Sequence, residues 1–150
     1  MRVVVQRVSS ASIKIDHVDG GEIGGGLVVL VGFEEEDTRD DLEWMCRKLV
    51  NLRIFDDESG VMNYNIEQVQ GSFMLVSQFT LHASTRKGNR PSYIKAAKPD
   101  IAIPLYEKFL ELMAEETECK IETGKFGAYM EIELINDGPV TLSMDTKNKE

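Results

Sequence analysis

Two short polar segments interrupt the sequence at places where chemistry could be carried. Ser77 and Gln78 stand inside the largely apolar stretch of residues 73–81. A buried polar side chain costs free energy unless it is hydrogen-bonded. These two residues therefore either face a ligand pocket or lie at a strand end where they meet water. The residue pattern alone leaves both interpretations open.

The second polar segment is Asn-Asp-Gly-Pro at residues 136–139. Its composition predicts a turn, and an ordinary hairpin turn is one interpretation. The other is a rigid functional turn, because a peptide bond that precedes proline can be cis in tight turns. A cis bond between Gly138 and Pro139 would direct backbone carbonyl oxygens toward a ligand in a fixed geometry.

A loop expected over residues 83–99 reverses the charge of the rest of the chain. The whole protein has a formal net charge of −9. Residues 82–98 nevertheless contain no acidic side chain and several cationic ones, namely Arg86, Lys87, Arg90, Lys95 and Lys98. The loop is either a solvated charged segment or a phosphate-binding patch on an acidic protein. Tyr93 lies within it and could stack on a nucleobase.

The side chains that most enzymes use for catalysis are missing from recognisable motifs. The two histidines, His17 and His82, belong to no cluster with metal-ligand spacing. Cys-x-x-Cys, His-Glu-x-x-His and Gly-x-x-x-x-Gly-Lys motifs are absent, so we expect no metal centre and no cofactor. The glycines of residues 20–26 lie between predicted strands, which favours a hairpin over a phosphate-binding loop. No Ser-His-acid set can be assembled from the sequence.

Hydrophobic periodicity places the elements that must position these segments. Apolar residues at helical spacing from Leu42 predict a helix over residues 38–51. A second helix is expected to begin near Ile103, with Pro104 in its first turn. Apolar or alternating runs, with turns at residues 19–21 and 56–60, predict strands over residues 2–8, 11–17, 27–31, 52–55, 72–82, 119–123, 128–135 and 140–144. We therefore expect an α+β fold, a β-rich layered domain of mostly antiparallel, barrel-like sheet covered by two main helices.

Length and composition exclude several classes of protein. The 150 residues, 42% of them hydrophobic, fit one domain over residues 1–150. No apolar run approaches the ~20 residues of a spanning helix, so we expect no membrane span, and no signal peptide is recognisable. Cys46 and Cys119 are expected to be free thiols in the cytoplasm. The negative charge argues against a non-specific nucleic-acid binder unless cations gather locally.

Several segments together strongly resemble the D-aminoacyl-tRNA deacylases of the D-tyrosyl-tRNA deacylase type. They are residues 1–8, 77–81 and 136–141, supported by residues 86–91 and 126–130. The resemblance covers nearly the whole chain and implies a homodimeric, cytoplasmic editing hydrolase. Such an enzyme cleaves the ester that joins a D-amino acid, or misplaced glycine, to the terminal adenosine of tRNA. It would spare the L-aminoacyl ester and require neither metal nor cofactor.

The resemblance also implies roles for individual residues. Ser77, Gln78 and Phe79 would line the catalytic pocket, with the Phe79 backbone N–H near the ester. Gly138 and Pro139 would enter the pocket of the other subunit as a Gly-cisPro pair. There their carbonyl groups would exclude an L side chain, whereas glycine, which has no side chain, would be admitted.

Other residues would support the substrate or the Gly-Pro pair. By the same resemblance, Arg7 would brace the Gly-Pro turn and Met130 would lie near the terminal adenosine. The basic loop, through Arg86, Lys87 and Arg90, would contact the tRNA.

Three accounts of the activity remain open after the resemblance. In the first, the 2′-hydroxyl of the RNA and backbone amides of the protein activate the ester, so no side-chain base is needed. In the second, the hydroxyl of Thr80 is the nucleophile, and His82 lies two residues further on. In the third, the protein is a nucleic-acid-binding module that uses its basic loop and catalyses nothing.

Overall fold

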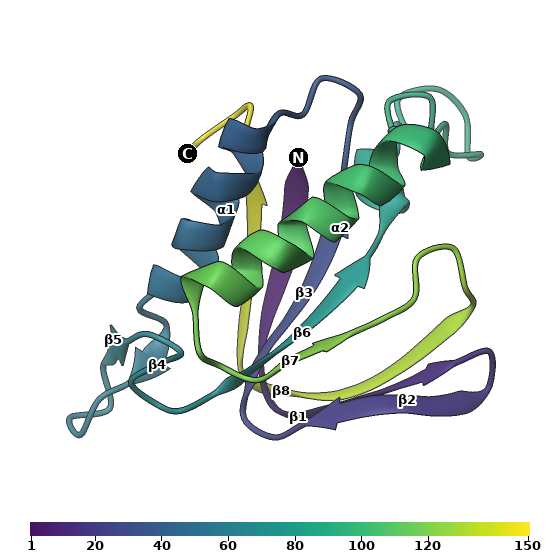
Figure 1. Cartoon of the computed structure of the whole chain (residues 1–150). Helices are drawn as coiled ribbons and strands as arrows, with labels where there is room; N and C mark the ends of the chain where they lie inside the picture. The colour runs from purple at the N-terminus through teal and green to yellow at the C-terminus, as the bar shows by residue number, and fades with distance from the viewer.

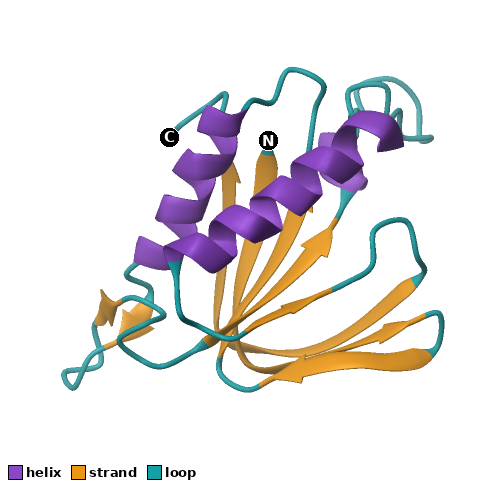
Figure 2. Ribbon diagram, viewed as in Figure 1, coloured by secondary structure: helices purple, strands orange, loops and turns teal.

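The computed structural model describes residues 1–150 as a curled sheet with two helices packed on one face (Figures 1 and 2). The elements in chain order are β1 (Arg2–Ile15), β2 (Val18–Ile23), β3 (Gly26–Gly32), α1 (Arg39–Asn51), β4 (Phe55–Asp56), β5 (Met62–Tyr64), β6 (Ser72–Ser77), the 3₁₀ turn η1 (Phe79–His82), α2 (Pro99–Glu116), β7 (Ile121–Thr123) and β8 (Met130–Asp145). This architecture confirms the predicted β-rich α+β fold. Neither helix is long and apolar enough to cross a membrane.

The strand β1 is the centre of the sheet, because it pairs antiparallel with β2, β3 and β8. Figure 1 shows β1 and β8 running together behind the helices and then curving away with β2. The prediction of two strands, over residues 2–8 and 11–17, is wrong at Ser9 and Ser10. The strand β1 continues through these residues, with a register shift against β8 between Val8 and Ser10, because β8 stays paired with β1 on both sides of the shift.

The expected hairpin turn at residues 136–139 is also wrong. Gln6 pairs with Thr141 and Val8 pairs with Asn136, so residues 137–140 stand opposite Arg7 alone. The turn-forming residues make a bulge inside one long strand, because β1 offers the same partner strand on both sides of them. No strand other than β1 pairs with β8, so the far edge of β8 is unpaired.

The other half of the sheet is parallel. β6 pairs parallel with β3 on one side and with β7 on the other. Parallel neighbours require long crossover connections, and α1 and α2 lie in these connections. Both helices cover the same face of the sheet (Figure 2).

The main hydrophobic core fills the space between the helices and the sheet. The predicted apolar stripe of α1, formed by Leu42, Met45, Cys46, Leu49 and Val50, is buried in it in full. The helical spacing therefore identified the buried face correctly. The start of α2 differs from the prediction, since the helix begins at residue 99, where a proline takes the first-turn position, and Pro104 falls inside it.

A second, smaller core lies within the curl of the sheet. It joins Ile13 of β1, Val28 of β3 and Met74 of β6, and the partly buried Met130 and Ile132 of β8 pack against it. This cluster holds the first residues of β8 against the end of β6. It therefore brings together two parts of the chain that are far apart in sequence.

Three smaller predictions are corrected by the backbone. The turn expected at residues 19–21 lies at Asp16 and His17, which adopt positive φ, and residues 19–21 belong to β2. The strand expected over 52–55 is limited to β4, which pairs with β5 around the turn at residues 57–61. The strand expected over 72–82 ends at Ser77 and gives way to η1.

Candidate active site

A hollow of about 300 Å³ opens where β6 runs into η1. Its walls come from two segments, the end of β6 with the start of η1, and the β7–β8 connection with the start of β8. The lining residues are Val76, Ser77, Gln78, Phe79, Phe126, Gly127, Ala128, Tyr129, Met130 and Ile132. The structure thus brings together four of the residues singled out in the sequence, Ser77, Gln78, Phe79 and Met130.

The end of β3 determines where β6 stops. Gln78 N–H donates to the Val31 carbonyl at 2.6 Å as the last bond along β3, and β3 itself ends at Gly32. A Cβ on Gly32 would lie 2.7 Å from the Gln78 carbonyl oxygen and 3.1 Å from the His82 ring. Only glycine therefore lets η1 fold over the end of β3, and this close approach turns Phe79 and Thr80 out of the sheet.

The backbone amides of Phe79 and Thr80 open η1. The first N–H groups of a helical turn have no acceptor within it, and because Phe79 lines the hollow, its amide is available to an oxygen there. The hydroxyl of Thr80 accepts a hydrogen bond from Gln78 Nε2 at 2.6 Å. Underneath, the buried Tyr106 hydroxyl donates to the Leu75 carbonyl at 3.0 Å and fixes β6; burial raises the pKa of Tyr106 to about 12.

His82 does not act as a base for Thr80 in this arrangement. Its ring is fully buried, neither ring nitrogen has a hydrogen-bond partner, and the nearest carboxylate oxygen, on Glu34, is 4.0 Å from Nδ1. The expected strand would have placed His82 and Thr80 on one face, but η1 turns the two side chains apart. No carboxylate or imidazole is hydrogen-bonded to the Thr80 hydroxyl.

The opposite wall of the hollow is formed by the β7–β8 connection. A Cβ on Gly124 would lie 2.5 Å from the Met130 sulfur, and Phe126 packs against the ring of Tyr106 with centroids 6.0 Å apart. The sequence reasoning selected only Met130 here and missed Phe126 and Tyr129 as lining residues. The available signal was the segment of residues 126–130, which supports the family resemblance and contains both side chains.

Gly138 and Pro139 lie outside the hollow of their own chain. They are exposed on the bulge of β8, and the peptide bond between them is cis. The structure therefore does not bring this pair together with Ser77 and Phe79 within one chain.

Arg7 fixes the backbone next to this bulge. Its side chain is largely buried, and Nε donates to the Asp137 carbonyl at 3.0 Å. Nη1 donates to the Ile54 carbonyl at 2.6 Å and to the Asp56 carboxylate at 3.3 Å. The guanidinium thus ties the residue before Gly138 to the β4 segment, a link to Ile54 and Asp56 that the sequence did not reveal.

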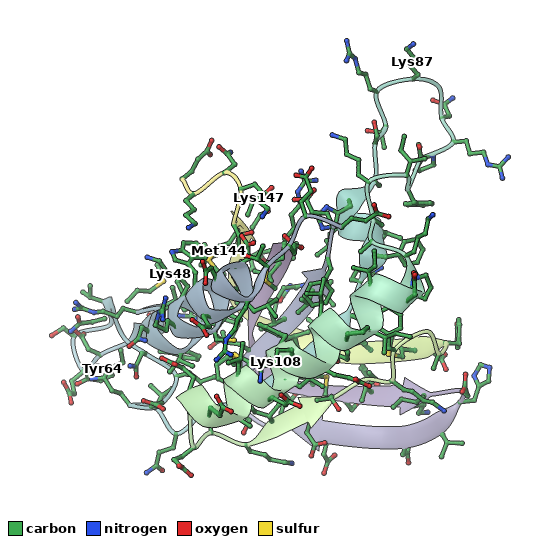
Figure 3. All side chains as sticks on the ribbon, turned by 45° about the horizontal axis from the view of Figure 1, so that its top comes forward. Lys48, Tyr64, Lys87, Lys108, Met144 and Lys147 are labelled. Carbon is green, nitrogen blue, oxygen red and sulfur yellow. The ribbon has the colours of Figure 1, made fainter.

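The basic loop projects from the body of the protein between η1 and α2. Ser84 and Ser92 exchange two backbone hydrogen bonds, at 2.8 and 2.9 Å, which join the two ends of the loop formed by residues 85–91. Figure 3 shows Lys87 at its tip, pointing away from the sheet. Arg86, Lys87 and Arg90 are exposed and form no ion pair, so their charges are free for a ligand. No group of three or more His, Cys, Asp or Glu side chains is placed to hold a metal ion.

Comparisons with known proteins agree with the resemblance seen in the sequence. A curated D-aminoacyl-tRNA deacylase of Bacteroides thetaiotaomicron is 60% identical, and one of Flavobacterium johnsoniae is 55% identical; each alignment covers 100% of both chains. A solved structure titled c-Myc DNA Unwinding Element Binding Protein is 41% identical, with a TM-score of 0.91 over 97% of this chain and 98% of that one. A probable eukaryotic D-amino acid tRNA deacylase, 18% identical, shares the fold with a TM-score of 0.82 over 95% of this chain and 97% of that one.

The sequence model of the D-Tyr-tRNA(Tyr) deacylase family matches residues 4–145. This range includes both walls of the hollow, the basic loop and the bulge of β8. Together with the full-length identity to curated relatives, it shows that the chain belongs to the D-Tyr-tRNA(Tyr) deacylase family and is a hydrolase.

Proposed function

We propose that this chain hydrolyses the ester between a D-amino acid, or glycine, and the terminal adenosine of tRNA. The observation that carries the proposal is the hollow beside Phe79, where the Phe79 backbone amide at the start of η1 lies opposite a wall that contains Met130. In this proposal the hollow of about 300 Å³ holds the aminoacyl group and part of the terminal nucleoside. The exposed cations of the basic loop give the rest of the tRNA a place to bind.

Backbone amides and the substrate's own 2′-hydroxyl supply the catalysis in this proposal. Water adds to the ester carbonyl carbon, the bond to the ribose oxygen breaks, and the ribose oxygen takes up the proton that the water loses. The Phe79 N–H donates to the carbonyl oxygen as negative charge develops there; one such donor changes rates by about 10²–10³-fold. The absence of any base hydrogen-bonded to Thr80 favours this route over a threonine nucleophile.

We further propose that the enzyme works as a homodimer in which each Gly138–Pro139 pair completes the hollow of the partner. Two observations support this proposal. The pair is exposed and absent from the hollow of its own chain, and the edge of β8 that carries it has no partner strand. The carbonyl groups of this pair, held in place through the Arg7 bond to the preceding Asp137 carbonyl, would crowd the side of the α-carbon from which an L side chain projects. The two free cysteines fit a reducing, cytoplasmic setting for the reaction.

Deacylation of a matched pair of substrates tests the proposed activity. One tRNA is charged with a D-amino acid or with its L enantiomer, and glycyl-tRNA forms a third arm. We expect fast loss of the D and glycyl esters and a spared L ester. Survival of all three esters would refute the proposed activity, and equal loss of the D and L esters would refute the chiral filter.

Two changes separate the catalytic routes. We expect Thr80→Val to keep near-normal turnover, and a substrate ending in 2′-deoxyadenosine to lose it. Complete loss with Thr80→Val and normal turnover of the deoxy substrate would support the threonine nucleophile instead.

The shared site is tested by mixing two variants that each have lowered turnover of the D ester. Ala128→Trp fills the hollow, and Gly138→Ala distorts the projecting pair. Exchange of subunits would create dimers with one intact composite site, so we expect activity to return on mixing. Activity that never returns although differently tagged subunits purify together as mixed dimers would place the pair outside the partner's hollow.

A second candidate function is nucleic-acid binding without catalysis. It is favoured by the unpaired cations of the basic loop and by the similarity to the 41% identical structure, which is named as a DNA-element-binding protein. In that case Arg86→Glu with Lys87→Glu would weaken the binding of all tRNAs, and no ester would be hydrolysed. Turnover of the D ester by the native protein would exclude this candidate as the whole function.

A further inference from the structure

Two exposed aromatic rings pack against each other at the edge of the hollow. Phe79 of η1 is 54% exposed and Tyr93 is 41% exposed. Their centroids are 5.1 Å apart and their planes meet at 73°. Large apolar rings that stay in water beside a binding site are typical of surfaces that stack on flat ligands.

The two rings differ in position. Phe79 lines the hollow, whereas Tyr93 does not. Tyr93 follows the Ser84–Ser92 bridge that closes the basic loop. The ring pair therefore lies between the hollow and the cations of residues 86–90.

The backbone that carries Tyr93 is fixed on both sides. Ser92 N–H donates to the Ser84 carbonyl at 2.9 Å, and Ala96 N–H donates to the Tyr93 carbonyl at 3.0 Å. The ring is thus presented from a closed turn and not from the free tip of the loop. A pre-positioned ring binds a planar ligand with less loss of conformational freedom.

We infer that Tyr93 stacks on the unpaired nucleobase that precedes the terminal nucleoside of the tRNA. This inference rests on the proposed function, which places the terminal nucleoside in the hollow. The preceding base then lies outside the hollow and beside Tyr93, and the RNA continues from there toward the basic loop.

The expected effect is confined to substrates that possess this nucleotide. Stacking of one base on an aromatic side chain strengthens binding by roughly 5- to 150-fold. Tyr93→Ala should therefore raise the KM for D-aminoacyl-tRNA within this range and leave kcat unchanged. Hydrolysis of D-aminoacyl-adenosine, which lacks the preceding nucleotide, should be unaffected.

Matched variants separate stacking from other roles. Tyr93→Phe keeps the ring and should behave as the native protein, and Ile94→Ala removes the neighbouring 90% exposed side chain and should change nothing. Tyr93→Ala should leave the salt dependence of tRNA binding unchanged because it removes no charge, whereas Arg90→Gln should reduce the salt slope by about one.

Two results would overturn the inference while leaving the proposed function intact. One is equal loss of activity on D-aminoacyl-adenosine and on D-aminoacyl-tRNA, because Tyr93 would then act only by supporting Phe79. The other is an unchanged KM for the tRNA substrate. If the native protein hydrolyses neither substrate, the proposed function fails. The inference is then tested by the binding of uncharged tRNA. The native protein should bind tRNA with an intact single-stranded 3′ end more tightly than tRNA with a trimmed end, and Tyr93→Ala must abolish this difference in affinity.

Discussion

Replacement of Arg7 by methionine should both destabilise the protein and weaken its proposed selectivity. The guanidinium donates to two backbone carbonyls, on Asp137 and Ile54, and to the half-exposed Asp56 carboxylate. A hydrogen bond from a charged group contributes about 1.5–3 kcal/mol, and an exposed ion pair adds at most about 1 kcal/mol. Methionine fills similar volume and avoids the desolvation of a buried charge. We therefore expect a net loss of about 3 kcal/mol in the free energy of unfolding.

Urea unfolding followed by the fluorescence of Trp44, the single tryptophan, would measure this loss. The same variant should hydrolyse an L-aminoacyl-tRNA faster, because no guanidinium then donates to the Asp137 carbonyl and fixes the backbone next to Gly138. Each 1.4 kcal/mol lost from the exclusion of the L side chain corresponds to about a tenfold loss of discrimination. The ratio of D to L deacylation rates, measured on one tRNA, reports it.

A matched control is Arg39→Met, since Arg39 is exposed and pairs only with Glu43 on the same helix. We expect this control to leave the unfolding midpoint and the D to L ratio unchanged. An Arg7→Met protein with native stability and native selectivity would refute the assignment of Arg7 as the brace. Loss of stability with native selectivity would separate Arg7 from the chiral filter.

Three further predictions follow from individual residues. Gly138→Ala places a side chain at φ +127°, so we expect it to cost about 1–3 kcal/mol in urea unfolding and to lower D-ester turnover. Burial raises the pKa of the Cys46 thiol to about 12, so alkylation at pH 8 followed by mass spectrometry should modify only the partly exposed Cys119 until the protein is unfolded. Burial opposes ionisation of Asp41, but hydrogen bonds, above all from Lys147, lower its pKa overall. The pair therefore stabilises the native state above the unfolded-state pKa near 4, and the advantage over Lys147→Met, about 0.5–1 kcal/mol at neutral pH, should shrink as the pH falls below that value.

The spacing of apolar residues along the chain predicted those helices and strands whose position depends only on neighbouring residues. The stripe from Leu42 to Val50 identified both the helix α1 and its buried face. The apolar run before Ser77 predicted a strand correctly. Where that strand ends depends on Gly32, 45 positions earlier in the chain, and no local pattern contains that information.

The same distinction applies to the candidate site. The residues at 136–139 have the composition of a turn, but a bulge forms because β1 remains the partner on both sides. Ser77, Gln78 and Phe79 came from a local contrast in polarity and from the family resemblance. Phe126 lines the same hollow because it packs on Tyr106 and the main core, and Tyr129 lines it because it precedes Met130, which the second core holds near the end of β6.

The bulge of β8 also has a consequence for how this protein tolerates changes in length. An insertion within residues 130–136 would shift the strand by one position and turn its apolar side chains from the core to water. An insertion within residues 137–140 would leave both flanking segments paired with β1 as they are now. The reach of the Gly138–Pro139 projection can therefore lengthen or shorten during evolution without any change to the hydrophobic interior.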